Sequence, residues 1–316
     1  MIVRIVRDWI APDLLRQTPN SQGLWDGIQF TEEEIKECDY LICLNPPKKK
    51  LQVKAKQAWL LTQEPPVEYY DWHKAAFPYF NKVYTQHPNT AANIVHEQCS
   101  LPWHIGKTYN ELIDLQPASN KINKVSTVTS NAYERPGHKA RYDLIQYLRD
   151  IEFDLELFGR GIRFVEDKYD GIAPFKYSIA IENSFYPHYW TEKLTDCLLS
   201  WTMPIYAGCP NITDYFPEEA LLIVDPFDKQ AAKEQIEHAI ATDRWQKNIE
   251  AIRHARQLIL KEYQFFPAMA KKIRTFEENH PKADKQSYTI PRVPRPKYGT
   301  LKERATNRVK NILGMK

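Results

Sequence analysis

The polar residues that follow the apolar segment 177–181 have the types and spacing expected of a ligand-binding loop. Glu182, Asn183 and Ser184 stand where a buried strand would end, and Thr191, a favoured helix N-cap residue, follows a short loop. In open α/β sheets, ligands bind at the carboxyl ends of strands, where helix N-termini direct their free N–H groups. We therefore expect this loop to face a cleft, although a strand-end Asn is also a common turn former.

Lys193 lies in the first turn of the helix that is expected to begin at Thr191. A cation at this position opposes the helix dipole by roughly 0.3–1 kcal/mol unless an anion offsets it. A bound phosphate would supply that anion. Alternatively, Lys193 pairs with Glu192 or Asp196 on a surface helix. The segment itself favours neither interpretation.

Motifs that bind phosphate through glycine-rich loops are absent from the sequence. The chain has ten glycines, contains no GxxxxGK[ST], and does not continue Gly159-Arg160-Gly161 with a third glycine at the dinucleotide-binding spacing. It also lacks a GxSxG nucleophile elbow and an Asp-x-Asp sequence, to which Asp154-Leu155-Glu156 is the nearest approach. We expect any phosphate to be held by side chains and a helix N-terminus.

The composition is that of a soluble globular protein of about two domains, with 316 residues, 43% hydrophobic and 26% charged, and a mean hydropathy of −0.57. No segment approaches the roughly 18 apolar residues of a membrane span. Charges at Arg4, Arg7 and Asp8 interrupt any signal-peptide core, so we expect a cytoplasmic protein. The five cysteines are scattered and lack metal-ligand spacing, so we expect them to be reduced and predict no metal site.

The charge is distributed unevenly along the chain. Residues 282–316 contain ten Lys or Arg against two acidic residues, a local net charge of +8, which leaves −5 for residues 1–281. The body of the protein is therefore unsuited to binding nucleic acid. The Pro, Arg and Lys content of 286–300 predicts an extended linker. The apolar helical face at 301–313 predicts either a solvated tail or contact with an anionic membrane surface.

Short apolar segments separated by helix-compatible ones predict an α/β protein in three parts. These are an N-terminal α/β lobe (1–116), a second α/β lobe with trailing helices (117–280) and a basic tail (281–316). A long helical pattern at 229–278, interrupted at Pro267, belongs to the second part. Buried strands are expected at 2–6, 40–44, 58–62 and 82–84 in the first lobe, and at 125–130, 153–158, 177–182, 203–207 and 221–224 in the second, with helices at about 139–149 and 191–201.

Several motifs follow one another in a fixed order through the second lobe. They are Ser130-Asn131, the basic stretch 138–142, Leu157-Phe158-Gly159, Tyr177 with Tyr189–Leu194, Met203–Gly208 and Tyr215-Phe216-Pro217. This series, over about residues 124–227, resembles the donor-binding signature of glycosyltransferase family 10, the α1,3/α1,4-fucosyltransferases. The N-terminal lobe matches weakly, at Gln63-Glu64-Pro65-Pro66, where the family usually has Glu-Ser-Pro after an apolar strand.

The resemblance implies a GT-B architecture, in which two Rossmann-like lobes face a central cleft. It also implies transfer of L-fucose from GDP-fucose to a hydroxyl of an acceptor glycan, with inversion and without a required metal or other cofactor. A metal-free enzyme must neutralise the departing diphosphate with protein cations and N–H dipoles. For this role we predict Lys193 and Arg141, whose guanidinium can grip phosphate in bidentate fashion, with Lys139 and His138 as alternatives to Arg141. By resemblance, Tyr189 hydrogen-bonds phosphate, Glu192 accepts the ribose hydroxyls, and Glu182, Asn183 and Ser184 help to shape the donor pocket.

Inversion by single displacement also needs a base that takes the proton from the acceptor hydroxyl. Glu64 is the predicted base, because it follows the apolar strand at 58–61 and so lies at a carboxyl end, and Pro65-Pro66 prevents a helix directly after it. Glu68 and Asp71 are nearby alternatives. The non-catalytic interpretation of Glu64 is an exposed loop carboxylate.

The matching motifs concern mainly the nucleotide and its phosphates, so two other functions stay open. One is the same fold with a different nucleotide sugar, and the other is binding of a nucleotide sugar or glycan without turnover. The predicted partners are a nucleotide-sugar donor and an acceptor oligosaccharide or glycoconjugate, but not nucleic acid. Peripheral contact of the basic tail with the inner membrane surface is the alternative to a solvated tail.

Overall fold

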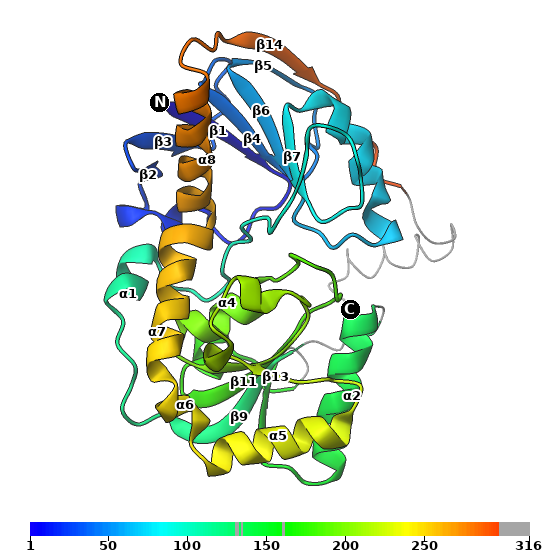
Figure 1. Ribbon diagram of the computed structural model, residues 1–316, viewed down its shortest axis with the longest axis vertical. Helices are drawn as coiled ribbons and strands as arrows, with labels where there is room; N and C mark the ends of the chain where they lie inside the picture. The colour runs from blue at the N-terminus through cyan, green and yellow to red at the C-terminus, as the bar shows by residue number, and fades with distance from the viewer. Residues whose placement is uncertain (130–132, 134, 160–161, 297–316) are drawn as a thin grey trace.

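The protein consists of two α/β lobes, one above the other (Figure 1). The structure is a computed structural model that describes residues 1–129, 133, 135–159 and 162–296. The tail at 301–313, for which an apolar helical face was predicted, lies outside the described residues, as do Ser130-Asn131 and Arg160-Gly161. The predicted α/β class is confirmed.

The N-terminal lobe is built on a seven-stranded sheet with the strand order β2-β3-β1-β4-β6-β7-β8. Its strands are parallel except for β2, which forms a hairpin with β3. The four strands predicted here are confirmed as β1, β4, β6 and β7. The strand bounds are β1 Ile2–Arg7, β2 Leu24–Trp25, β3 Ile28–Thr31, β4 Tyr40–Leu44, β6 Gln57–Leu61, β7 Lys82–Thr85 and β8 Ile94–His96.

Strand β4 shows why the central strands of this lobe appear in the sequence as uninterrupted apolar segments. All five of its residues are buried, because both faces of a parallel sheet are covered. On one face Ile42 packs in a cluster with Phe265 and Met269, and on the other face Cys43 packs in a cluster with Phe77. Phe77 belongs to the 3₁₀ helix η3 (Glu68–Tyr79), which follows β6.

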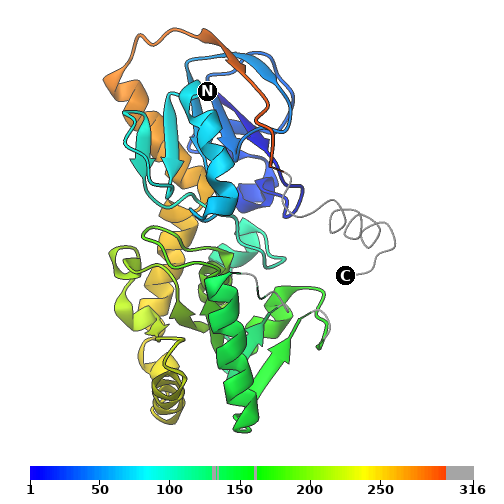
Figure 2. The same ribbon diagram turned by 90° about the vertical axis from the view of Figure 1, so that its right-hand side faces the viewer.

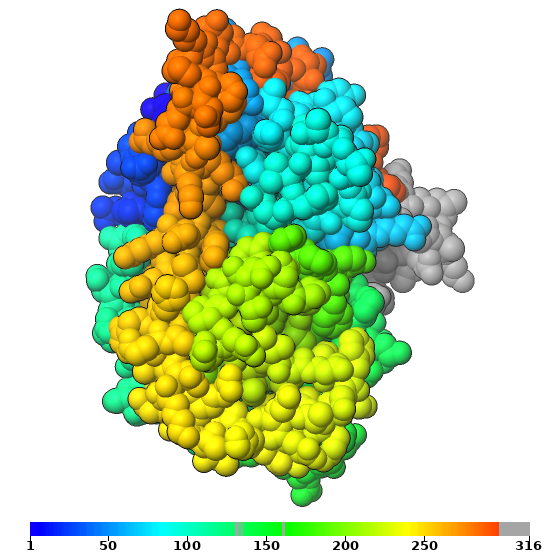
Figure 3. Space-filling view, in the orientation of Figure 1, coloured from blue at the N-terminus to red at the C-terminus, as the bar shows by residue number. Residues whose placement is uncertain are grey.

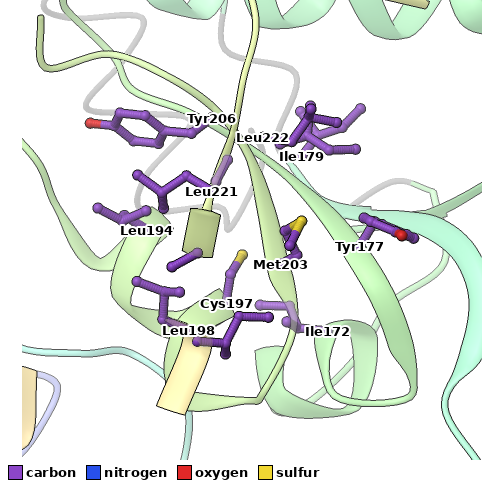
Figure 4. Close-up of a cluster of buried hydrophobic side chains, with 14 of the residues drawn as sticks. Ile172, Tyr177, Ile179, Leu194, Cys197, Leu198, Met203, Tyr206, Leu221 and Leu222 are labelled. Atoms are coloured by element: carbon purple, nitrogen blue, oxygen red, sulfur yellow. The ribbon is translucent and has the colours of Figure 1, made fainter. Parts of the chain in front are cut away.

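The C-terminal lobe is built on a five-stranded parallel sheet with the order β10-β9-β11-β12-β13. Each of the five strands predicted there is present, with ends shifted by at most three residues. Figure 4 shows Leu194, Cys197 and Leu198 of helix α4 in one apolar cluster with Met203 of β12. The bounds are β9 Ile122–Val128, β10 Leu155–Phe158, β11 Phe175–Ile181, β12 Met203–Ala207 and β13 Leu222–Ile223, with helices α2 Pro136–Asp150, α3 Lys168–Ile172, α4 Glu192–Leu199, α5 Lys229–Ala241, α6 Arg244–Lys247 and α7 Ile249–Leu258.

The last helix, α8 (Phe265–Asn279), returns to the N-terminal lobe. A π-helical turn at Ile259–Tyr263 joins it to α7, and the two helices run along both lobes (Figure 1). The assignment of this segment to the second lobe was therefore wrong, because the apolar face of α8 covers the N-terminal sheet. The helical pattern is interrupted not at Pro267, as predicted, but before it. Pro267 lies in the first turn of α8, where a backbone N–H has no intrahelical partner, so proline is tolerated there.

The predicted linker at 286–300 is wrong over its first five residues, which form strand β14 (Gln286–Ile290). β14 pairs antiparallel with β5 (Leu51–Ala55), which the sequence analysis did not predict, and Ile290 is buried beside Leu51 and Val53. Residues 286–290 therefore belong to the N-terminal lobe rather than to a separate tail. The remaining short elements are α1 Tyr109–Asp114 and the 3₁₀ turns η1 Leu15–Gln17, η2 Pro19–Ser21, η4 Ile212–Asp214 and η5 Glu218–Ala220.

The five cysteines are all buried and none forms a disulfide, as expected from their spacing. In the described part of the chain, none of the helices has the length and apolar character needed to cross a membrane.

Candidate active site

A cavity of about 250 Å³ lies where the carboxyl ends of the two sheets face each other. The N-terminal lobe contributes residues that follow β1, β4 and β6, and the C-terminal lobe contributes residues that follow β11 and begin α4. On the face shown in Figure 3, the two lobes meet along a continuous seam. The cavity is lined by Trp9, Ala11, Pro12, Asn45, Gln63, Glu64, Leu101, Pro102, His104, Asn183, Tyr189, Thr191, Glu192 and Lys193.

A second cavity, of about 350 Å³, lies between α5 and the amino ends of β9 and β10. Its charged groups already pair with one another, Lys124 with Asp154 and Lys233 with Glu237. The smaller cavity is the better candidate, because ligands of α/β sheets bind at the carboxyl ends of the strands.

The start of helix α4 is fixed by a buried carboxylate. Thr191 is the N-cap residue, as predicted, and its hydroxyl accepts a hydrogen bond from the Lys193 N–H at 3.3 Å. The fully buried Glu182 accepts from the Thr191 N–H and from its hydroxyl, both at 2.7 Å. Gly208 is needed beside it, since an added Cβ would lie 2.4 Å from the Glu182 Cγ. Glu182 thus ties the end of β11 to the first turn of α4.

Lys193 lines the cavity, and its side chain is 20% exposed. Its Nζ lies 3.0 Å from the Glu192 Oε1 and 3.7 Å from the Glu182 Oε2. The pairing with Glu192 is confirmed, and phosphate binding stays a prediction for a lysine that borders the cavity. Two carboxylates offset the unfavourable placement of the cation at a helix N-terminus.

Glu192 sits among three basic side chains. Burial acts to raise its pKa, but the charges of Lys193, His104 and Lys168 outweigh burial and hold that pKa well below its ordinary value. Lys168 also lies 3.4 Å from Asp196, whose carboxylate accepts from the His104 N–H at 2.7 Å. The interlobe connection at His104 is thereby attached to α4. Lys168 and His104 were not among the predicted site residues.

The loop after β11 brings Asn183 and Tyr189 to the cavity wall. Tyr189 is 3% exposed, and burial and neighbouring carboxylates raise its pKa well above the ordinary value. Ser184 is buried but is not part of the cavity lining, and its Oγ has no hydrogen-bond partner among the described residues. The Asn183 carbonyl accepts from the Gly137 N–H at 3.2 Å, so the first turn of α2 also reaches this loop.

Helix α2 places its three candidate phosphate-binding residues differently. Arg141 is buried, and its Nη1 donates to the Ile181 carbonyl at 3.4 Å. Burial lowers the pKa of Arg141, and the charges of Glu182 and Glu192 oppose this effect. Lys139 points to the exposed side of the helix, with its Nζ 6.0 Å from the centre of the Tyr133 ring. His138 is buried in the first turn. None of the three belongs to the cavity lining, and Arg141 interacts electrostatically with the carboxylates of Glu182 and Glu192.

Glu64 comes from the N-terminal lobe and borders the same cavity as Lys193. Burial raises its pKa, and a hydrogen bond from the Tyr70 hydroxyl and the charge of Arg135 partly oppose that rise. The alternatives Glu68 and Asp71 are exposed, and Asp71 pairs with Lys74 at 2.7 Å. Of these three carboxylates, Glu64 is the one that faces the cavity.

Three further cavity residues follow strands that the sequence did predict. Trp9 comes two residues after β1, Asn45 directly after β4 and Gln63 two residues after β6. The Trp9 Nε1 donates to the Gln63 Oε1 at 2.8 Å, and the Gln63 N–H donates to the Asn45 Oδ1 at 2.8 Å. Their position at carboxyl ends was the available signal, which in the N-terminal lobe had indicated only Glu64. Within the described ranges, no three His, Cys, Asp or Glu side chains are grouped closely enough to hold a metal ion.

Comparison with known proteins matches residues 118–269 to the family model described as glycosyltransferase family 10 (fucosyltransferase), C-terminal part. The 4-galactosyl-N-acetylglucosaminide 3-alpha-L-fucosyltransferase FUT6 of Gorilla gorilla gorilla is 27% identical over 120 residues, which cover 35% of this chain and 33% of that protein. The alpha-(1,3)-fucosyltransferase B of Drosophila melanogaster is 37% identical over 67 residues, which cover 21% of this chain and 15% of that protein. The chain thus matches a third or less of the length of these two relatives.

Two solved structures share the fold at low sequence identity. A crystal structure of an alpha1,3-fucosyltransferase with GDP superimposes with a TM-score of 0.50 and 15% identity, over 84% of this chain and 91% of that chain. Anabaena Alr3699/HepE in complex with UDP-glucose gives a TM-score of 0.50 and 10% identity, over 76% of this chain and 79% of that one. Residues 118–269 therefore match the C-terminal domain of glycosyltransferase family 10, and the chain has a GT-B fold.

Proposed function

We propose that this protein transfers L-fucose from GDP-fucose to a hydroxyl of an acceptor glycan, with inversion and without a required metal. The observation that carries the proposal is that Glu64 from one lobe and Lys193 from the other border one cavity. A base and a cation on opposite sides of a small cavity suit a displacement in which a proton leaves one side and an anion leaves the other. The family match supports a nucleotide-sugar donor.

The proposed reaction is a single displacement at the anomeric carbon of fucose. The acceptor oxygen forms a bond to this carbon as its proton passes to the Glu64 carboxylate, and the bond from the carbon to the GDP oxygen breaks. Lys193 and the first N–H groups of α4 stabilise the charge that develops on the diphosphate. Arg141, which interacts electrostatically with Glu182 and Glu192, contributes further positive charge near the start of α4.

Donor identity is tested with a panel of nucleotide sugars. We expect GDP-fucose to raise the melting temperature more than GDP-mannose or UDP-glucose at equal concentration, because at a given concentration the ligand that binds the folded state more tightly stabilises it more. Release of GDP in the presence of acceptor, with and without a chelator, then tests turnover and the need for metal. The strongest protection by a UDP-sugar would show that the same fold uses another donor. Protection without product would show a binding protein.

The proposed acceptor is an oligosaccharide or glycoconjugate, and the proposed location is the cytoplasm, with the basic tail on the inner membrane surface. Because β14 belongs to the folded lobe, the tail is best removed after Pro296 rather than before Gln286. We expect the full chain to sediment with vesicles containing anionic lipid, and the truncated chain to remain in the supernatant. Equal sedimentation of both chains would exclude a role of residues 297–316.

A further inference from the structure

Arg135 stands at a helix position for which arginine is poorly suited. It is the N-cap of α2, where Ser, Thr, Asp or Asn would accept a hydrogen bond from the first turn, and where a cation opposes the helix dipole. Its side chain makes no capping hydrogen bond. The extended backbone at Arg135 (φ −113°, ψ 156°) is accounted for by Pro136, which disfavours helical geometry in the residue before it. The contacts that account for an arginine at this position must therefore lie outside α2.

That side chain crosses from the C-terminal to the N-terminal lobe. The Arg135 Nη2 donates to the Tyr70 hydroxyl at 2.7 Å, and the guanidinium carbon lies 5.2 Å from the centre of the Tyr70 ring. Tyr70 is 7% exposed and belongs to η3. Figure 2 shows the first turn of α2 (green) directed toward the N-terminal lobe above it.

The Tyr70 hydroxyl has a single proton, and this fixes the direction of the contacts. Because the hydroxyl accepts from Arg135, its own proton is available for the Glu64 carboxylate, and hydrogen bonding from this hydroxyl acts to lower the pKa of Glu64. The chain therefore runs from the guanidinium through the phenol to the carboxylate. The Tyr70 hydrogen bond and the charges of Arg135 and Arg295 lower the pKa of Glu64, whereas burial and the charge of Asp8 raise it.

We propose that Arg135 and Tyr70 are positioning residues that orient the Glu64 carboxylate toward the acceptor hydroxyl. Because Arg135 and Tyr70 come from different lobes, this orientation depends on contact between the lobes. The phenol proton stays on Tyr70 throughout, and the acceptor proton goes to Glu64. This inference rests on the proposed role of Glu64 as the base. It assigns a function to a contact that joins the two halves of the site.

The test compares Tyr70→Phe with Tyr69→Phe. Tyr70→Phe removes the hydrogen bond to Glu64, and we expect the acid limb of the kcat/KM profile to move up by roughly one to two pH units. The loss of activity is then greatest at low pH and shrinks as the pH rises. Tyr69 is the control in the same helix: its hydroxyl accepts from Arg295 at 2.9 Å, and Arg295 acts on Glu64 only through its charge, so we expect a much smaller shift than in Tyr70→Phe.

Arg135→Gln is expected to move the same limb in the same direction, with the dissociation constant for GDP unchanged within about twofold. Arg135→Lys, which keeps the charge, should shift the limb less than Arg135→Gln does. The variant with both Tyr70→Phe and Arg135→Gln should shift the limb by less than the sum of the two single shifts, because Arg135 acts partly through Tyr70 and partly through its own charge. GDP affinity that falls as much as kcat would identify Arg135 as a donor contact and overturn the proposal.

A measurement that does not depend on turnover separates this inference from the proposed function. The Glu64 carboxyl ¹³C resonance, assigned by its absence in Glu64→Gln, is titrated in the wild type and in Tyr70→Phe. We expect a higher titration midpoint in Tyr70→Phe, and an unchanged midpoint would refute the chain of contacts. Absence of GDP release by the wild type would refute the proposed function, whatever the titration shows.

Discussion

Replacing Glu64 by Gln is expected to lower turnover by about 10²–10⁴-fold, the contribution typical of a positioned general base. The amide keeps the size of the side chain but cannot accept the acceptor proton. GDP affinity should be unchanged within about twofold, because in the proposed mechanism the donor diphosphate binds to the other lobe. Steady-state kinetics with GDP-fucose and acceptor, together with calorimetric titration of GDP, measure the two quantities.

The pH dependence follows from the raised pKa of Glu64. Below that pKa the carboxylate is protonated, so wild-type kcat/KM should fall as the pH drops through a value above the ordinary 4.5. A folded-state pKa above the unfolded value also means that ionisation of Glu64 lowers stability at pH values above the folded pKa. Glu64→Gln should therefore melt at the same temperature as the wild type or higher at pH 7. This separates loss of catalysis from loss of fold.

Glu68→Gln is the control for the base assignment, since Glu68 is exposed and lies outside the cavity lining. It should keep wild-type activity. Wild-type turnover by Glu64→Gln would contradict the assignment, and loss of turnover in Glu68→Gln alone would transfer the role to that residue.

Replacing Lys193 by Met is expected to lower kcat by about 10²–10³-fold, as removal of one group that stabilises transition-state charge does in other enzymes. A charge-assisted contact to phosphate would also be lost in the bound state, so GDP affinity should fall by about tenfold or more. Lys193→Arg should retain part of the turnover rate and part of the GDP affinity. Unchanged GDP affinity and kcat in Lys193→Met would leave Lys193 as a partner of Glu192 only.

Lys193→Met also removes the cation beside the buried Glu182, so part of the effect comes from stability. Lys176→Met is the matched control: Lys176 is 14% exposed and pairs with Asp243 at 2.7 Å. It lies near the start of β11, about 20 Å along the strand from Glu182. It should lose stability without losing turnover. Thermal unfolding of both variants, measured beside their kinetics, distinguishes the two causes.

The sequence predicted the buried strands well because parallel strands covered on both faces are continuous apolar runs. β4 and β12 match their predicted bounds. β5 escaped because its residues alternate between buried and exposed, and its short pattern lies between two stronger ones. β14 escaped because Pro and basic residues beyond Ile290 dominate the composition of that segment. Residues 286–290 form a strand because they pair with β5, which is more than 200 residues away in the sequence.

The candidate site was predictable where it depends on one loop and its helix. Thr191 and Lys193 followed from capping preferences and the helix dipole, which are local rules. Arg135 and Tyr70 could not be found in this way, because they are 65 residues apart and meet only when the two lobes come together. The exposed direction of Lys139 depends on which face of α2 meets the sheet, and helical periodicity in the sequence did not settle that.

The return of α8 and β14 to the first lobe has a consequence for synthesis on the ribosome. The second lobe is one uninterrupted stretch of chain up to α7, so it can complete its core as soon as that stretch has emerged. The sheet that is translated first must wait for Phe265, Met269 and finally Ile290 before both of its faces are covered. The part of the polypeptide that is made earliest is therefore the last to become native, and until then its apolar strands are open to chaperones.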